Sequence, residues 1–175
     1  MPEDGRRYEL YDGQVSVVPA PLPRHQVIAL NVADMLRADA RAHGGFAVTS
    51  PIDITFSDYD VAQPDVIYFS PARAHLVDLN RVIRRAPDLC VEVLSRSTAA
   101  TDRGKKMQMF ARYAVGEYWI VDPASETIET YELRGSGYAL LRRFSGEERV
   151  GSPTLPDHVF QARSIFPDAS GTPRG

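Results

Sequence analysis

The sequence predicts a single α/β domain, bordering on α+β, built on a mixed β-sheet that is flanked by helices and extended by a hairpin at each end. Three observations favour this class: a long helical pattern near the N-terminus, a strand–helix–strand passage from Leu89 to Val121, and hairpin signals at both ends. The passage implies a parallel strand pair through a right-handed crossover, whereas hairpins pair strands antiparallel. At 175 residues the chain is long enough for one domain and too short for two ordinary ones.

The N-terminal half is expected to contain a hairpin, a helix and a second hairpin. Residues alternate around Asp12-Gly13, which is a strong two-residue hairpin signal. After a proline-rich break, apolar residues recur at helical spacing and stop at Gly44-Gly45. The second hairpin is expected to turn through residues 57–60. The expected elements are strands at 8–11 and 14–18, a helix at 24–43, and strands at 46–56 and 61–69.

The C-terminal half continues the sheet. A basic connection precedes a strand that is apolar except for Glu92, then a Ser/Thr-rich turn and a helix, and a third hairpin turns around Gly135-Ser-Gly137. The domain is expected to span residues 1–166, and the polar, Pro- and Gly-containing residues 167–175 are expected to be a disordered tail. The expected elements are a short helix within 70–87, a strand at 89–94, a helix at 101–114, and strands at 117–121, 127–133 and 138–144.

Composition excludes several classes of protein. The single cysteine, Cys90, lies in an apolar strand, which rules out a disulfide framework and fits a reducing cytosol. No stretch approaches the roughly 20 apolar residues that span a bilayer, and the first residues carry no signal-peptide pattern. A cytoplasmic protein that contacts no membrane is therefore expected. No glycine-rich phosphate loop, zinc-ligand spacing or dinucleotide fingerprint is present, so no organic cofactor is expected.

Charge is distributed unevenly along the chain. The net charge is −3, yet between residues 81 and 112 eight cations stand against three acids. A basic segment around an acidic site suits a polyanion, and Arg96, Arg103 and Lys105 are the candidate nucleic-acid contacts. The alternative is an ordinary solvated helix face next to a basic loop.

Two carboxylates are the main candidates for chemistry, because each stands alone in an apolar strand. Asp65 follows Pro64, and Glu92 shares its strand face with Cys90 and Leu94. A buried unpaired charge is costly and is tolerated when it pairs with a cation, binds a metal or serves chemistry. If the two strands are neighbours, both carboxylates can converge on one hard cation. The alternative is that each acid pairs with a nearby arginine.

A lysine in the following helix is selected by periodicity. Lys106 shares a stripe with Met109, Phe110 and Tyr113, whereas Lys105 aligns with a solvated face that includes Asp102. Lys106 is therefore expected to point toward the sheet and the Glu92 carboxylate, the alternative being a long stem that snorkels at the core edge.

Three further residues are weaker site candidates. His25 lies on the apolar stripe in the first turn of the long helix, where a packed, hydrogen-bonded histidine is the usual interpretation. Glu9 lies in the first hairpin, and Gln63 is expected on the same strand face as Asp65.

Several short motifs follow one another at distinctive spacing. They are Arg7-Tyr-Glu-Leu-Tyr-Asp-Gly13, Pro23-Arg-His-Gln26, Gln63-Pro-Asp65, Pro87-Asp-Leu-Cys-Val-Glu-Val-Leu-Ser95, Ser97-Thr98, Asp102-Arg-Gly-Lys-Lys106 and Glu117-Tyr-Trp-Ile-Val-Asp-Pro123. From about residue 6 to residue 166 the chain resembles the Uma-two family of restriction-type endonucleases, within the PD-(D/E)XK nuclease superfamily. The resemblance implies a restriction-endonuclease-like core and a Mg²⁺-dependent nuclease site in which Mn²⁺ can substitute.

The resemblance also implies roles for individual residues. Asp65 and Glu92 match the two metal-binding acids, and Glu9 and His25 match positions near the site. The superfamily places its lysine two residues after the second acid, where this chain has Leu94. In this family the lysine comes from the following helix, which matches Lys106.

The sequence departs from the family pattern at three places. Phe110 stands where a tyrosine is usual, and Gln14 where a glutamate is frequent. Relatives carry a short helix before the first hairpin, and this sequence either lacks that helix or begins after it.

The hypothesis that follows is a metal-dependent endonuclease that hydrolyses DNA phosphodiester bonds. Asp65 and Glu92 would hold Mg²⁺ or Mn²⁺, and Lys106 would assist. The alternative is a catalytically silent nucleic-acid-binding or assembly domain with the same fold. The expected partners are double-stranded DNA, called on the resemblance alone, and a second copy of the chain, because the terminal hairpins offer unpaired strand edges.

Overall fold

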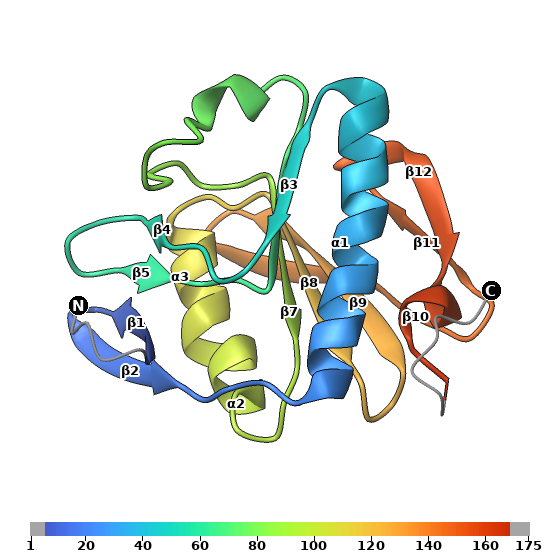
Figure 1. Ribbon diagram of the computed structural model, residues 1–175, viewed down its shortest axis with the longest axis horizontal. Coiled ribbons are helices and arrows are strands. Elements are labelled where there is room, and N and C mark those ends of the chain that lie inside the picture. The colour runs from blue at the N-terminus through green and yellow to red at the C-terminus, as the bar shows by residue number, and fades with distance from the viewer. Residues whose placement is uncertain (1–5, 169–175) are drawn as a thin grey trace.

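The computed structural model describes residues 6–168, and the strands of this part form three sheets (Figure 1). The six-stranded sheet has the order β10-β9-β8-β7-β6-β3, the four-stranded sheet has the order β2-β1-β5-β4, and β11 pairs with β12. The strands are β1 (Arg7–Tyr11), β2 (Gln14–Val18), β3 (Phe46–Thr49), β4 (Ile54–Thr55), β5 (Val61–Ala62), β6 (Val66–Phe69), β7 (Leu89–Val93), β8 (Glu117–Asp122), β9 (Thr127–Arg134), β10 (Gly137–Ser145), β11 (Arg149–Ser152) and β12 (Leu155–Gln161). The α-helices are α1 (Pro23–His43), α2 (Ala99–Thr101) and α3 (Met107–Arg112), with a π-helical turn at Asp102–Lys106 and 3₁₀ turns at Ala74–Leu76 and Ala162–Ile165.

The six-stranded sheet is mixed, as the sequence predicts. β7 and β8 are parallel, with Leu89 opposite Glu117, whereas every other neighbouring pair in this sheet is antiparallel. The helical segment that runs from α2 through the π-helical turn to α3 connects the two parallel strands. The predicted fold class, helices flanking a mixed sheet, is confirmed.

Each face of this sheet carries its own core. Figure 1 shows α1 on one side of the sheet and α3 on the other. Successive residues of a strand point to opposite faces, so Trp119 packs with α1 while Tyr118 packs with α3, and both are fully buried. Burying one such large side chain stabilises the fold by roughly 1.5–3 kcal/mol. The parallel strands are apolar on both faces for this reason.

The first hairpin and the long helix form as predicted. Tyr11 pairs with Gln14, so Asp12-Gly13 is the whole loop, and both residues have positive φ, at 49° and 79°. Positive φ at both loop positions is the geometry of a type I′ turn, which matches the twist of the strands. The helix ends at His43, where Gly44 adopts the left-handed conformation with φ 86°.

The second predicted hairpin is divided between two sheets, which corrects the prediction of two long strands. Its outer part, β4 and β5, joins the first hairpin through the pairing of Leu10 with Val61, and its inner part, β3 and β6, joins the central sheet. Pro51 and Pro64 lie at the breaks, and proline has no N–H to donate to a strand ladder. The division leaves Asp65 at the point where the chain passes from one sheet to the other.

One element was absent from the sequence prediction. β11 and β12 form a short hairpin, which Glu117 anchors by accepting hydrogen bonds from Ser152 Oγ (2.7 Å) and the Thr154 amide (3.1 Å). Pro156 and the polar residues of β12 obscure any period-2 pattern. The tail expected at 167–175 lies outside the described residues from position 169 onward. None of the helices in residues 6–168 is long and apolar enough to span a membrane.

Candidate metal-binding acidic site

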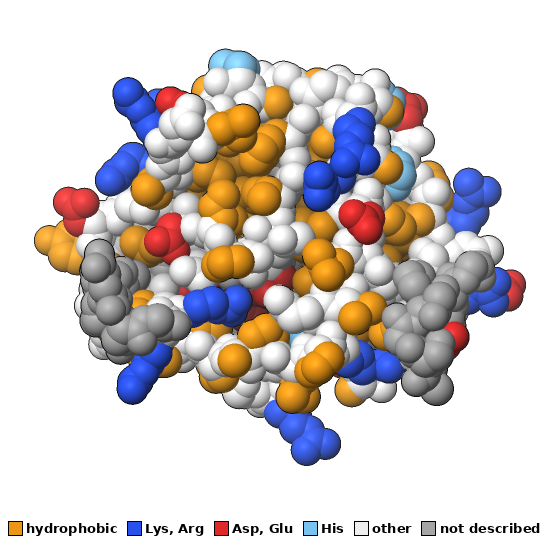
Figure 2. Space-filling model, viewed as in Figure 1, with side chains coloured by type: hydrophobic (Ala, Val, Ile, Leu, Met, Phe, Trp, Pro, Cys, Tyr) orange, Lys and Arg blue, Asp and Glu red, His pale blue; other side chains and the backbone are white. Residues whose placement is uncertain are grey.

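A cavity of about 360 Å³ opens where the two larger sheets meet the N-terminus of α1. Its walls are the first hairpin, the segment Pro19–Leu22, the turn Ser95–Thr98 and the π-helical turn. Figure 2 shows acidic side chains at the bottom of a hollow near the middle of the molecule. Glu9, Asp65, Glu92, Asp102 and Lys106 line this cavity, although each is 5% exposed or less.

The two strand carboxylates are brought together by strand register. β6 and β7 are neighbours, and Val66 pairs with Val91, so Asp65 and Glu92 are the next opposed positions at this end of the pair. The condition for the two carboxylates to converge, that their strands are neighbours, is thus met. Both side chains line the same cavity.

Asp65 is held by a backbone amide and by a histidine rather than by an arginine. Its Oδ2 accepts a hydrogen bond from the Val93 amide (2.8 Å) and lies 3.2 Å from His25 Nε2. Burial alone would lower the pKa of His25, but its hydrogen bond with Asp65 and the negative charge of that carboxylate outweigh burial and raise the pKa. His25 is thereby placed inside the site rather than only in the helix–sheet core.

Lys106 is the central cation of the site. Its Nζ lies 2.8 Å from Glu92 Oε1, 3.0 Å from Glu9 Oε1 and 3.8 Å from Asp102 Oδ1. Lys105 is exposed, so the predicted orientations of the two lysines are confirmed. Burial favours the neutral amine, but the surrounding carboxylates outweigh it and raise the pKa of Lys106 well above its ordinary value. The alternatives of arginine-paired acids and a snorkelling lysine are both wrong.

Asp102 corrects the prediction of a solvated face. The Asp102 side chain is 2% exposed and lies on the same side of the helical segment as Lys106, which follows four residues later in the sequence. Residues Asp102–Lys106 form a π-helical turn, and within it the Asp102 carboxylate faces Lys106 rather than solvent. The i,i+4 spacing of the two residues was the available signal for this contact.

Glu9 lies closer to the centre of the site than its weak sequence signal suggested. Besides Lys106, it accepts hydrogen bonds from the Gln63 amide (2.8 Å) and from the Tyr11 hydroxyl (2.7 Å). Gln63 lines the cavity, but its side-chain Nε2 donates to Asp53 (2.7 Å) instead of to an acid of the site.

Among the buried side chains that line this cavity, carboxylates outnumber cations. Glu9, Glu92 and Asp102 surround the ammonium of Lys106, and the buried carboxylate of Asp65 lines the same cavity. Burial raises the pKa of Glu92 well above its ordinary value. The charge of Lys106 opposes this rise, and the other acids reinforce it. Burial likewise raises the pKa of Asp102. A further cation would offset this excess of buried carboxylates.

The donor set fits a hard divalent cation. Carboxylate oxygens are the ligands that Mg²⁺ and Mn²⁺ prefer, and the buried Oδ2 of Asp102 has no hydrogen-bond partner in the described chain. Within residues 6–168, however, no three acid, histidine or cysteine side chains are already spaced to hold a metal. Because Lys106 contacts Glu92, the site holds its carboxylates around the ammonium.

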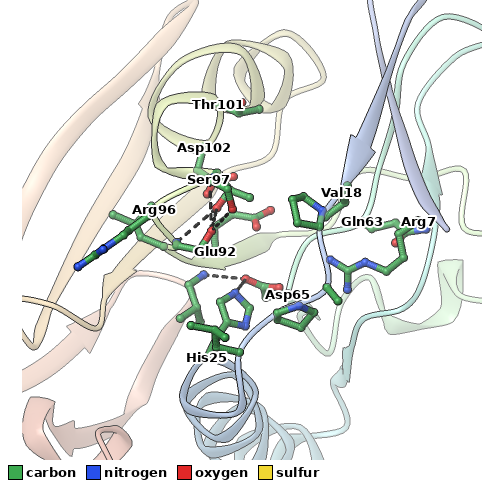
Figure 3. A pocket seen from close by; sticks show the side chains of 18 of the residues that line it. Arg7, Val18, His25, Gln63, Asp65, Glu92, Arg96, Ser97, Thr101 and Asp102 are labelled. Atoms are coloured by element: carbon green, nitrogen blue, oxygen red, sulfur yellow. Dashed lines mark hydrogen bonds and ion pairs between the residues drawn. The ribbon is translucent and has the colours of Figure 1, made fainter.

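The predicted nucleic-acid contacts fall into different environments. Arg96 lies on the rim, and Figure 3 shows its side chain directed away from Asp65 and Glu92. Lys105 is exposed, whereas the guanidinium of Arg103 lies 2.5 Å from Glu129 Oε2. Arg103 therefore attaches the π-helical turn to β9.

Glu129 provides a test of that attachment. It also pairs with Arg143. Burial alone would raise the pKa of Glu129, but the guanidinium groups of Arg103 and Arg143 outweigh burial and lower the pKa below its ordinary value. We expect Glu129→Gln to reduce the free energy of unfolding at pH 7 by about 1.5–3 kcal/mol. A lowered pKa stabilises the fold above the unfolded-state value, and this stabilisation is lost as pH falls through the folded-state value. Urea unfolding of wild type and variant should therefore converge toward pH 3.

Glu132→Gln is the matched control, because Glu132 lies on the same strand with an exposed partner, Arg134. Its effect should stay within about 0.5 kcal/mol. An equal loss of unfolding free energy for Glu129→Gln at pH 7 and at pH 3 would contradict an electrostatic attachment of the π-helical turn to β9.

Comparisons with known proteins identify the class of the fold first. A solved structure from Anabaena variabilis ATCC 29413, described as "a putative nuclease belonging to DUF820", matches with a TM-score of 0.78, covering 95% of this chain and 93% of that chain at 20% sequence identity. The fold is therefore shared with that protein. The chain itself belongs to the Uma2 family, described as "Putative restriction endonuclease", whose model matches residues 1–163. This confirms the family that the motifs predicted. No curated protein matches the chain.

Proposed function

We propose that the chain is a metal-dependent endonuclease that hydrolyses phosphodiester bonds of DNA. The observation that carries the proposal is the excess of buried carboxylates, opposed by one ammonium group, at the bottom of an open cavity. The family description and the fold shared with a nuclease-type protein support the same reaction class. A cation bound by these carboxylates would offset their repulsion of a substrate phosphate.

In the proposal, Asp65 and Glu92 would hold Mg²⁺, or Mn²⁺ in its place. A bound divalent cation lowers the pKa of a coordinated water and offsets negative charge on the phosphate. Lys106 would orient the attacking water or support developing charge, and it would have to share Glu92 with the cation. His25 would keep the Asp65 carboxylate oriented.

Cleavage of DNA is the direct test. Purified protein should convert supercoiled plasmid to open and linear forms with Mn²⁺ and leave it intact with EDTA. Intact plasmid under both conditions would contradict the proposal.

Binding of Mn²⁺ can be tested without catalysis. Because burial raises the pKa of Glu92 and Asp102, binding should displace protons from these carboxylates. We therefore expect the Mn²⁺ affinity measured by calorimetry to rise as the pH is raised. Glu92→Gln should weaken binding at least about tenfold, whereas Glu132→Gln should not change it.

A silent nucleic-acid-binding or assembly domain is the rival proposal. It is favoured by the Lys106–Glu92 contact, which occupies one of the proposed metal ligands. Absence of any heat of Mn²⁺ binding, together with retained DNA binding, would select this rival.

The finer proposal for the substrate is double-stranded DNA cut by a homodimer, since cutting both strands with one site per chain requires two chains or two visits. β2 and β10 are edge strands, and they expose Val15 (60%), Val17 (51%) and Leu140 (51%). Proteins seldom leave such edges unpaired.

We expect sedimentation equilibrium at micromolar concentration to give about twice the 19.4 kDa mass of one chain. Val17→Asp and Leu140→Asp would then identify which edge pairs, because a buried unpaired charge at the interface should return the protein to the monomer mass. A wild-type protein at the monomer mass would remove the dimer from the proposal.

A further inference from the structure

An arginine that was not among the predicted site residues lies in the cavity. Arg7 stands two residues before Glu9 on β1, and alternate residues of a strand share a face, so both side chains point into the cavity. Figure 3 shows the Arg7 side chain reaching from the hairpin toward the side of the site that holds Asp65.

The carboxylates nearest to Arg7 are engaged by other groups. Glu9 binds Lys106 and two hydrogen-bond donors, and Asp65 binds the Val93 amide and His25. Across residues 6–168, no carboxylate forms an ion pair with Arg7, and its buried Nε has no hydrogen-bond partner.

The other cations that line the cavity either pair with acids or point away from the site. Lys106 is surrounded by acids, and Arg24 pairs with Glu126 at 2.8 Å. Arg96 is directed away from the acids (Figure 3). Arg7 is therefore a guanidinium inside the cavity whose donors remain available.

A buried guanidinium N–H without an acceptor is unfavourable, so an acceptor from outside the chain is expected. The planar guanidinium presents parallel N–H groups that match two oxygens of a phosphate. Beside it, Val18 pairs with Arg7 across the hairpin, and the apolar segment Pro19–Leu22 continues the wall. A charged group next to an apolar wall suits a phosphate that carries a sugar.

We propose that Arg7 binds the non-bridging oxygens of a backbone phosphate of the nucleic-acid strand in the cavity, and that it positions this strand against the acidic site. The inference rests on the proposed nuclease function and adds a substrate-binding residue to it. Arg7 acts on substrate binding and takes no part in the exchange of protons or bonds.

The test measures binding of a fluorescently labelled 20-base-pair DNA by anisotropy in EDTA. It uses Asp65→Asn as the background, which removes one negative charge from the cavity and prevents cleavage. In this background, Arg7→Ala should weaken binding at least about tenfold and should reduce the slope of log K against log salt by about 0.9, the value for one phosphate contact. Arg7→Lys should recover only part of the affinity, because lysine lacks the guanidinium fork.

Arg41→Ala is the matched control, since Arg41 is exposed in the last turn of α1, far from the helix end that carries His25. It should leave both affinity and salt slope near those of the background. Equal affinity and slope for Arg7→Ala and Arg41→Ala would overturn the role of Arg7. Failure of the background protein to bind DNA at all would overturn the proposed function and the inference with it. If Arg7→Ala does not fold, an unchanged salt slope in Arg7→Gln would overturn the role.

Discussion

Substitution of Asp65 by asparagine should reduce DNA cleavage by about 10³-fold or more while leaving the protein folded. Loss of a ligand that holds a catalytic cation removes several kcal/mol of stabilisation from the transition state, and each 1.36 kcal/mol is a factor of ten in rate. The asparagine oxygen can still accept the Val93 hydrogen bond. The change also removes one charge from a cavity that holds too many acids, so we expect the free energy of unfolding to stay within about 1 kcal/mol of wild type. Initial rates of plasmid nicking with Mn²⁺ measure the effect.

Asp58→Asn is the control for this substitution, because Asp58 is exposed in the turn between β4 and β5. Its cleavage rate should equal that of wild type. Near-wild-type nicking by Asp65→Asn would remove Asp65 from the proposed metal ligands.

Replacement of Lys106 by methionine should have the largest effect on stability. Methionine keeps an unbranched side chain that is one atom shorter but leaves Glu9, Glu92 and Asp102 without their shared cation. Removing one partner of a buried ion pair typically costs about 3–5 kcal/mol, because uncompensated charge remains in the interior. Urea unfolding of the metal-free protein at pH 8 measures this loss.

The loss of unfolding free energy in Lys106→Met should be smaller at lower pH, because the acids that remain can then be protonated. Without the ammonium, which opposes the effect of burial, the pKa of Glu92 and of Asp102 should rise further. An acid with a raised pKa in the fold favours folding below its unfolded-state pKa, and that advantage is lost as pH rises through the folded-state value. The deficit of Lys106→Met relative to wild type should therefore be smaller at pH 5 than at pH 8.

Lys105→Met provides a matched control one residue away. Lys105 is exposed, so its replacement should change the free energy of unfolding by no more than about 0.5 kcal/mol at either pH. Equal unfolding curves for the two lysine variants at pH 8 would contradict the central place of Lys106 in the acid cluster.

Local periodicity in the sequence was sufficient to distinguish these two lysines. Lys106 recurs at helical spacing with apolar residues and Lys105 does not, and this pattern depends only on residues within two turns. The same reasoning identified the β7 strand, the Asp12-Gly13 turn and the two strand carboxylates. Short-range patterns are reliable here because neighbouring residues alone determine which face of a helix or strand is apolar.

The composition of the site was decided by tertiary structure. Glu9 reaches Lys106 only because β1 joins β5 in the smaller sheet, which then packs beside the central one. Asp102 lies in a π-helical turn and faces Lys106, and their i,i+4 spacing was the local signal for this contact.

Arg7 enters the same cavity with Glu9, which lies two residues later on the same face of β1. These side chains come from segments far apart in the chain, so their distances depend on how the sheets pack. By itself the sequence determined the family, the mixed sheet and the identities of Asp65, Glu92 and Lys106 as candidates. The packing of the two sheets decided that Glu9, Glu92 and Asp102 share one ammonium group beside Asp65, because only tertiary contacts hold like charges together against their repulsion.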